Sequence, residues 1–477
     1  MTTRFSPGRR APAASGRLDR LASAMQQTEA KPRRQLPPGP PRKKLQTMRR
    51  LAADYTGFFH WLHEQWGDIV YFEVPNGGHC AVFDPDIAED LVRKPELFQK
   101  DTPAFAFEVI QSPCLARTPF GDEHRRLTDL TITAFTPERT AAFRRIAVSE
   151  ASSFAEELTE GSTVDFRAEV ERYTWNALTT SMLGAGRELG PGPGLAMMRA
   201  AKLSFIVFAM PGYRLLRKLP LPHDLKARKA IRPLDEVVYD SIRKARDPDS
   251  RETSLIAHFV QATERGESDW SFGSDSEIRD EAYAAFVGAW DPAVHAMAYI
   301  PHYLGRNPEV RARLEEEVDR VAGDRPLCAE DLERLPYAEA VFNELLRLQP
   351  AAPLLVPRRA VRDTSLGGYF IPKGTLVEVV THVMHRRVEY WDDAEEFRPE
   401  RWLEGQACPR GGYLPFGLEP RGCRGVPLAM AVLVSGLAAL VRKWRLEPES
   451  DELPADGLEV GILSSPIRTR MVSRRAA

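Results

Sequence analysis

The 477-residue sequence lacks several features that would assign it to a common class of protein. It contains no GxGxxG or Walker loop, so the usual sequence marks of nucleotide binding are missing. Its formal charge is only −2, whereas nucleic-acid-binding proteins usually carry a strong basic excess. With 43% hydrophobic and 28% charged residues, the composition is ordinary for a globular protein and excludes a chain without a core. We therefore expect a folded protein without a nucleic-acid partner.

Cysteine is scarce, and no CxxC pair occurs. The five cysteines are widely spaced, at positions 80, 114, 328, 408 and 423. An odd number at such spacings does not suit the disulfide framework of a secreted protein. We expect reduced thiols in a cytoplasmic protein, with one cysteine in a special role.

Long hydrophobic runs are also missing. The apolar, uncharged stretch at residues 426–441 has 16 residues and includes Pro, Gly and Ser. A membrane-spanning helix needs about 20 residues, so this run predicts a buried core helix and no transmembrane anchor. The first fifty residues carry thirteen Lys or Arg and two acidic residues, without the apolar segment of a secretory signal. We expect residues 1–35 to form a disordered basic arm; an organellar transit peptide is the alternative.

Hydrophobic periodicity predicts a mainly α protein with a smaller β region. Helical spacing is found in residues 140–158, 170–183, 278–304, 310–321 and 333–348. Strand patterns with Gly and Pro turns occupy residues 69–83 and 354–380. Because the two β regions lie far apart in the chain, we expect one intimately packed fold over residues 36–477 and not a series of small domains.

One cysteine lies in a loop that suits a reactive or metal-binding sulfur. Residues 415–425 read PFGLEPRGCRG and are followed at once by the apolar helix. A cysteine in front of a helix meets free backbone N–H groups, and Arg421 and Arg424 add positive charge near Cys423. The thiolate could act as a nucleophile or as a soft ligand to iron. A purely structural cysteine remains the alternative.

A second candidate feature combines one acid with two arginines. Glu344 and Arg347 stand three residues apart on a predicted helix, and Arg401 follows in the stretch FRPERW. Such a pair is often a solvated surface contact, but the other faces of this helix carry Leu and Phe. If the acid is buried between both arginines, it joins the helix to the later loop, and all three partners are needed.

The order Glu-x-x-Arg, PERW and FGxxxRxCxG resembles the cytochrome P450 family of haem-thiolate monooxygenases. Further matches are LPPGP at Leu36, GGYFIPKGTLV, and the stretch THVMHRRVEYWDDAEEFRPERW, so the resemblance covers residues 36–477. It implies a single haem-binding domain with haem b as cofactor.

The resemblance also implies roles for individual residues. Cys423 would be the axial thiolate ligand of the iron, which favours cleavage of the O–O bond. Phe416 would pack near the sulfur, and Arg421, Arg358 and His124 would contact the haem propionates. Glu344, Arg347 and Arg401 would form the structural triad that supports the haem pocket.

The distal helix departs from the family pattern. Residues 288–293 read GAWDPA, in which Gly288 and Asp291 keep the family's small and acidic positions. Pro292 stands where the family usually has a threonine that helps to deliver protons. Proline has neither a hydroxyl nor an N–H group, so it either only fixes a kink or marks altered chemistry. In the second case a substrate hydroxyl or ordered water replaces the threonine, or peroxide is used, or the enzyme performs a rearrangement or coupling.

Two smaller departures concern the haem surroundings. Glu419 replaces the usual glycine of the cysteine loop, and Thr128 stands where an arginine is usual.

Family likeness also suggests the substrate pocket and the partners. The candidate pocket residues are Phe105, Phe107, Ile110, Phe205 and Ala289. Such walls favour an apolar or aromatic small molecule, in the biosynthesis of a specialised metabolite. Without a flavin or nicotinamide domain, electrons would come from a ferredoxin and its reductase. The alternatives are an enzyme that does not insert oxygen and a non-catalytic relative that activates a partner enzyme.

Overall fold

The structure is a computed structural model that describes residues 35–100, 114–115, 118, 121–187, 189–208, 222–247, 249–250, 252–266, 269–403, 411–418, 422–453 and 466–474. The expected basic arm at residues 1–35 lies outside these residues, except for Gln35. Within them the chain is mainly α with a smaller β part, as the sequence predicts.

Helices make up most of the described chain. Their bounds are α2 Lys44–Ala53, α3 Tyr55–Trp66, α4 Pro85–Val92, α5 Asp122–Ile132, α6 Pro137–Glu157, α7 Phe166–Leu178, α8 Gly192–Phe208, α10 Pro222–Ala230, α11 Arg232–Ala245, α12 Leu255–Arg265, α13 Asp275–Ala298, α14 Ile300–Arg306, α15 Pro308–Ala322, α16 Pro336–Leu348, α17 Thr381–Met384 and α18 Val426–Lys443. Short turns of other helix types are η2 Thr133–Phe135, η3 Thr179–Leu183, η4 Ala329–Arg334 and η5 Pro399–Trp402.

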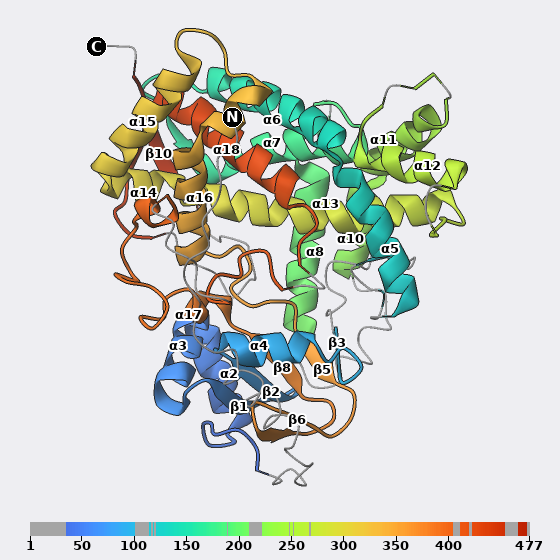
Figure 1. The fold of residues 1–477 in the computed structure, drawn as a ribbon, viewed down its shortest axis with the longest axis vertical. Coiled ribbons are helices and arrows are strands. Elements are labelled where there is room, and N and C mark those ends of the chain that lie inside the picture. The colour runs from blue at the N-terminus through green and yellow to red at the C-terminus, as the bar shows by residue number, and fades with distance from the viewer. Residues whose placement is uncertain are drawn as a thin grey trace, which may run out of the picture.

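Three sheets complete the described fold. The strands are β1 Ile69–Val74, β2 Gly77–Val82, β3 Phe98–Lys100, β4 Thr163–Asp165, β5 Arg358–Ala360, β6 Thr364–Leu366, β7 Tyr369–Ile371, β8 Leu376–Val379, β9 Trp444–Pro448 and β10 Arg468–Ser473. They pair in the orders β1-β2-β8-β5-β3, β4-β10-β9 and β6-β7. In Figure 1 the five-stranded sheet lies at the lower end with α2–α4, and the long helices α6, α7, α13 and α18 fill the upper part.

Turn and capping residues explain where elements begin and end. Gly367 and Gly368 both have positive φ, 55° and 80°, which suits the two-residue turn that joins β6 to β7. Ser274 caps α13 by accepting a hydrogen bond from the Glu277 N–H group. The glycine turn that the sequence predicts within residues 354–380 is therefore confirmed as a hairpin turn.

Two predicted helices have different bounds in the structure, and a proline explains each difference. The single helix expected over residues 278–304 is divided into α13 and α14 at Tyr299, with Pro301 in the first turn of α14. The helix expected from residue 333 begins at Pro336, after the short turn η4. Proline cannot donate a helical hydrogen bond, but it is tolerated in a first turn, so it favours a new start at both places.

The apolar helix α18 is the core helix that the sequence predicts. Its buried residues include Leu433, Leu437 and Leu440, and the Tyr173 hydroxyl on α7 donates to the Val432 carbonyl oxygen at 2.7 Å. Among the described residues it is the one helix long and apolar enough to cross a membrane, and 67% of it is buried inside the protein. A buried core helix passes such a test, so this is weak evidence for a membrane span.

Candidate active site

A buried carboxylate joins α16 to the loop that leads to η5. Glu344, Arg347 and Arg401 are 0%, 0% and 1% exposed. Glu344 Oε2 accepts from Arg347 Nε at 3.0 Å, and Oε1 accepts from Arg347 Nη2 at 2.9 Å and Arg401 Nε at 3.0 Å. The structure therefore brings the three residues together in one buried ion-pair network.

Further donors and acceptors saturate this network. Glu344 also accepts from the Arg398 backbone N–H group at 3.0 Å and from Trp402 Nε1 at 2.9 Å. Arg347 donates to the carbonyl oxygens of His385 and Ala394, and Arg401 donates to those of Asp392 and Asp393. Buried charges are tolerated when they are paired and hydrogen-bonded in this way. The network fixes the loop through residues 385–402 against α16.

Cys423 lies in a tight loop just before α18. Its N–H group donates to the Phe416 carbonyl oxygen at 2.8 Å, and Gly417 takes a positive φ of 78° that closes the turn. The residue is exposed, yet protein atoms enclose its sulfur closely enough for burial to act on it. The thiol is therefore accessible and is not sealed in the core.

Burial raises the pKa of the Cys423 thiol, and the Gly425 N–H group and Arg424 oppose that rise. Both opposing groups stabilise the thiolate. A cation at the sulfur would add to them and favour the thiolate strongly, because a coordinating thiol loses its proton.

Arg358 on β5 is a buried cation. It is 9% exposed, and burial alone lowers its pKa. Within the described part of the chain, no acceptor or carboxylate is paired with it. A buried guanidinium without an anion is costly, so the site suits a negatively charged ligand group.

His124 is buried in the first turns of α5. Its Nδ1 atom lies 3.3 Å from the Thr128 hydroxyl, which donates to the His124 carbonyl oxygen at 2.7 Å. Thr128, the departure noted in the sequence, thus contacts the histidine directly. Phe416 is partly buried and packs against the main hydrophobic core.

The middle of α13 opens to a space at Gly288. Phe286, Val287 and Trp290 around it are buried, but Gly288 is exposed, and a Cβ atom there would meet no described atom within 4 Å. Ala289 is partly buried beside it. This segment therefore carries small residues at an exposed position of the helix, and Pro292 lies inside the helix without ending it.

Trp290 is buried, in contrast to Gly288. Its ring stacks on Phe286 and meets Trp175 edge to face, and its Nε1 atom donates to the Glu171 carbonyl oxygen on α7. Gly194 on α8 approaches both tryptophans so closely that a Cβ atom would clash with them. Trp290 therefore packs α13 against α7 and α8.

Two acids on α13 have strongly raised pKa values. Burial, with a smaller contribution from Glu171, raises the pKa of Asp291 to about 7. Burial raises the pKa of Glu281 to about 7 as well, although its carboxylate accepts from the Leu115 N–H group at 2.7 Å. Sequence reasoning missed Glu281; the available signal was an acid within an apolar helical stretch. Groups that titrate near neutral pH can hold and release protons under working conditions.

Several predicted site residues cannot be placed. Arg421, Phe105, Phe107 and Ile110 lie outside the described residues, as does Glu419. Phe205 lies on α8, but its side chain is not among those described.

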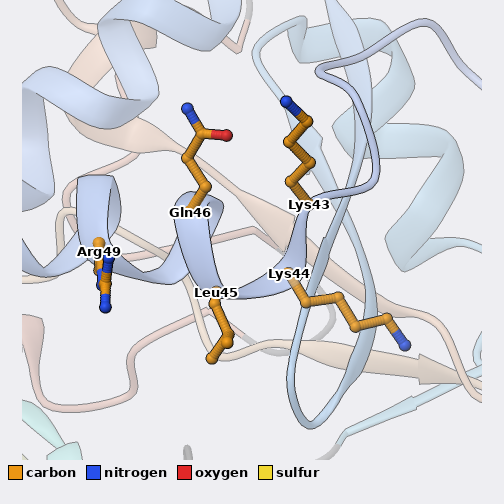
Figure 2. A pocket seen from close by; sticks show the side chains of 5 residues that line it. All are labelled: Lys43, Lys44, Leu45, Gln46 and Arg49. Atoms are coloured by element: carbon orange, nitrogen blue, oxygen red, sulfur yellow. The ribbon is translucent and has the colours of Figure 1, made fainter.

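A separate hollow lies on the surface at the start of α2. It is lined by Lys43, Lys44, Leu45, Gln46 and Arg49, whose side chains splay apart and do not converge (Figure 2). Lys44 is 3.6 Å from Glu73 and so is already paired. The hollow contains none of the groups described above.

A family model described as cytochrome P450 matches residues 37–472. The chain belongs to the cytochrome P450 family. It is accordingly an oxidoreductase of a haem-binding family whose members act on small molecules with redox partners.

Curated relatives of this P450 come from several kingdoms. Cyclooctat-9-en-7-ol 5-monooxygenase of Streptomyces melanosporofaciens is 25% identical over 386 residues, or 80% of this chain and 83% of the relative. Steroid 17-alpha-hydroxylase/17,20 lyase of Ictalurus punctatus is 27% identical over 456 residues, with 87% and 86% covered. Pentalenene oxygenase of Streptomyces avermitilis is 32% identical over 243 residues, with 50% and 53% covered.

The residues of this P450 fit the cofactor of its family. A haem-thiolate protein would hold its cofactor by a cysteine sulfur and would place cations near the two propionates. Cys423 would supply the sulfur, which is accessible, and Arg358 is a buried cation without an anionic partner among the described residues. The exposed Gly288 leaves room beside the helix that the family resemblance assigns to the haem pocket.

Proposed function

We propose that this P450 is a monooxygenase that oxidises an apolar or aromatic small molecule, with Cys423 as the axial ligand of haem b. When bound, the haem supplies activation of oxygen. The observation that carries the proposal is Cys423 itself, an accessible thiol in front of a buried helix, with the buried Glu344 network bracing α16 and the following loop. The small residues Gly288 and Ala289 would form part of the substrate pocket.

The same proposal gives the other residues the roles that the family resemblance implies. Arg358 and His124 bind the propionates, Arg421 with them, and Phe416 packs near the sulfur. Asp291, whose pKa burial raises to about 7, can hold and release a proton near neutral pH. The proposal assigns the remaining apolar walls to Phe105, Phe107, Ile110 and Phe205, on the family resemblance alone.

The same proposal includes the redox partners and the cellular location of the enzyme. The enzyme acts in the cytoplasm on a specialised metabolite and receives electrons from a ferredoxin and its reductase. Two bacterial relatives support the substrate class, since one is named for an alkenol and the other for an alkene.

The rate of haem transfer tests the proposed contact between Arg358 and a haem propionate. Changing Arg358→Met removes a buried cation but keeps a long apolar side chain, so we expect the haem to transfer to apomyoglobin about tenfold faster. The haem-free protein should be at least as stable as the original, because the cost of an unpaired buried charge is gone. Arg359→Met is the matched control, since Arg359 donates to the Gly374 carbonyl oxygen and is only partly buried. Unchanged haem transfer in Arg358→Met would refute the propionate role.

Turnover under two oxidants tests the monooxygenase itself. With reduced ferredoxin and isotopically labelled dioxygen, we expect limonene or naphthalene to gain one labelled oxygen atom, as measured by mass spectrometry. If product forms only with hydrogen peroxide, the enzyme is peroxide-driven and the monooxygenase proposal is refuted. Pro292 motivates that second candidate, because it lacks the hydroxyl that usually assists proton delivery in the family.

A further inference from the structure

A histidine side chain holds the segment that leads into the Cys423 loop. The Leu414 N–H group donates to Nε2 of His385 at 2.8 Å. Both residues are buried, so water does not easily replace this acceptor. A buried backbone N–H group without a partner is costly, and the contact therefore fixes the backbone at Leu414.

Backbone contacts connect this position to the sulfur-bearing residue. The Leu414 carbonyl oxygen accepts from the Gly417 N–H group at 3.1 Å. Inside the same turn, the Phe416 carbonyl oxygen accepts from the Cys423 N–H group at 2.8 Å. A shift of the backbone at Leu414 would therefore move Phe416 and, through it, Cys423.

The backbone of His385 is itself held by the buried ion-pair network. Its carbonyl oxygen accepts from Arg347 Nη1 at 2.9 Å, and Arg347 is paired with Glu344. Its N–H group donates to the Thr381 carbonyl oxygen at the end of α17, which lies between α16 and the five-stranded sheet in Figure 1. His385 thus contacts the Glu344 network with its backbone and the segment before Cys423 with its ring.

The direction of the hydrogen bond from Leu414 determines the protonation of the ring. A backbone N–H group can only donate, so Nε2 carries no proton, and the proton of the neutral ring is on Nδ1. Burial, together with Arg386 and Arg347, lowers the pKa of His385 to about 3, and backbone groups of Arg347 and Leu346 oppose that change. The ring is therefore a neutral acceptor near neutral pH.

We propose that His385 is a positioning residue for the haem thiolate, because its ring holds Leu414 and thereby keeps Cys423 in the geometry that binds iron. It acts through the backbone of the loop. Without this contact the loop shifts more readily, and the sulfur is more easily protonated or released from the iron. The inference rests on the proposed function, in which Cys423 is the axial ligand, and adds a residue that maintains this ligand.

Two replacements of His385 separate its acceptor from the packing of its ring. His385→Phe keeps a ring next to that of Tyr413, whose centroid lies 5.4 Å away, but cannot accept from Leu414. His385→Gln can place an amide oxygen near the position of Nε2 and so restores an acceptor. His382→Phe is the matched control, because it makes the same substitution three residues earlier, where the ring contacts His60 on α3.

The measurement on the holoenzyme is the rate at which the thiolate-type carbon monoxide spectrum converts to the spectrum of a protonated thiol in mild urea. We expect this conversion to be about tenfold faster in His385→Phe, because the Leu414 N–H group loses its acceptor. His385→Gln should stay within about threefold of the original rate, and His382→Phe should match it. Hydrogen exchange at the Leu414 amide should accelerate in His385→Phe and not in the control.

The tautomer of His385 can be measured in the unchanged holoenzyme, so the test does not depend on the folding of a variant. The reduced carbon monoxide complex is diamagnetic and suits nitrogen NMR. We expect the proton of this ring on Nδ1 and none on Nε2. A proton on Nε2, or a charged ring near neutral pH, would overturn the inference.

The rates of the variants can overturn it as well. The inference is refuted if His385→Phe converts no faster than the original, or if His385→Gln converts as fast as His385→Phe. Equal acceleration in His382→Phe would refute it too, because the effect would then be a general loss of stability. Failure of the proposed function is a different result, since the original holoenzyme would then show no thiolate-type spectrum before any substitution.

Discussion

Cys423→Ser is expected to abolish the thiolate-type carbon monoxide spectrum of the reduced enzyme while leaving the fold intact. The spectrum depends on a thiolate bound to the iron, and a serine hydroxyl is a much weaker ligand. The fold should tolerate the change because serine is similar in size to cysteine and the loop is held by the backbone contact from the Cys423 N–H group to the Phe416 carbonyl oxygen. The measurement is the difference spectrum after reduction under carbon monoxide, together with circular dichroism.

Cys328→Ser is the matched control for this experiment. Cys328 is only partly buried, and its sulfur lies 3.3 Å from Asp331 Oδ2, a contact that a serine hydroxyl can keep. The control should retain the full spectrum. If Cys423→Ser keeps the original spectrum, another side chain holds the iron and the proposed function must be abandoned.

Glu344→Gln is expected to lower the stability of the folded protein strongly. Every contact to the Glu344 carboxylate comes from a donor: two from Arg347, one from Arg401, one from the Arg398 backbone and one from Trp402. A glutamine amide would turn its NH₂ group against several of these donors in either orientation. It would also leave two buried guanidinium groups without their anion. Breaking a buried ion pair in this way costs about 3–5 kcal/mol.

Urea unfolding and haem content measure that cost. We expect a lower unfolding free energy by about 3–5 kcal/mol and poor retention of haem, because the loop at residues 385–402 loses its anchor. Glu333→Gln is the control, since Glu333 pairs with Arg144 at the surface and is 67% exposed. That change should cost about 0–1 kcal/mol. Equal effects of the two substitutions would show that burial of the Glu344 network contributes nothing special.

The sequence predicts those parts of the fold that depend on local pattern. The hairpin at Gly367 and Gly368, the buried helix α18 and the pairing of Glu344 with Arg347 follow from turn chemistry, apolar composition and helical spacing. The break between α13 and α14 was not predicted, because apolar spacing continues through Tyr299 and the effect of Pro301 depends on its position within the turn.

The direction of single side chains could not be predicted in the same way. Trp290 faces α7 and packs with Trp175, which depends on how two distant helices cross. Glu281 is a similar case, since its partner Leu115 lies far away in the sequence. The contribution of Trp402 to the Glu344 network likewise depends on the path of a loop that has no periodic pattern.

The parallel pairing of β2 with β8 has a consequence for how the protein is made. His79 is aligned with Leu376, so the first hairpin emerges from the ribosome long before the strand that covers its edge. Until β8 has been synthesised, β2 presents unpaired backbone groups of the kind that recruit other chains into aggregates. Growth of the nascent chain past β8 therefore marks the point at which this sheet can first close.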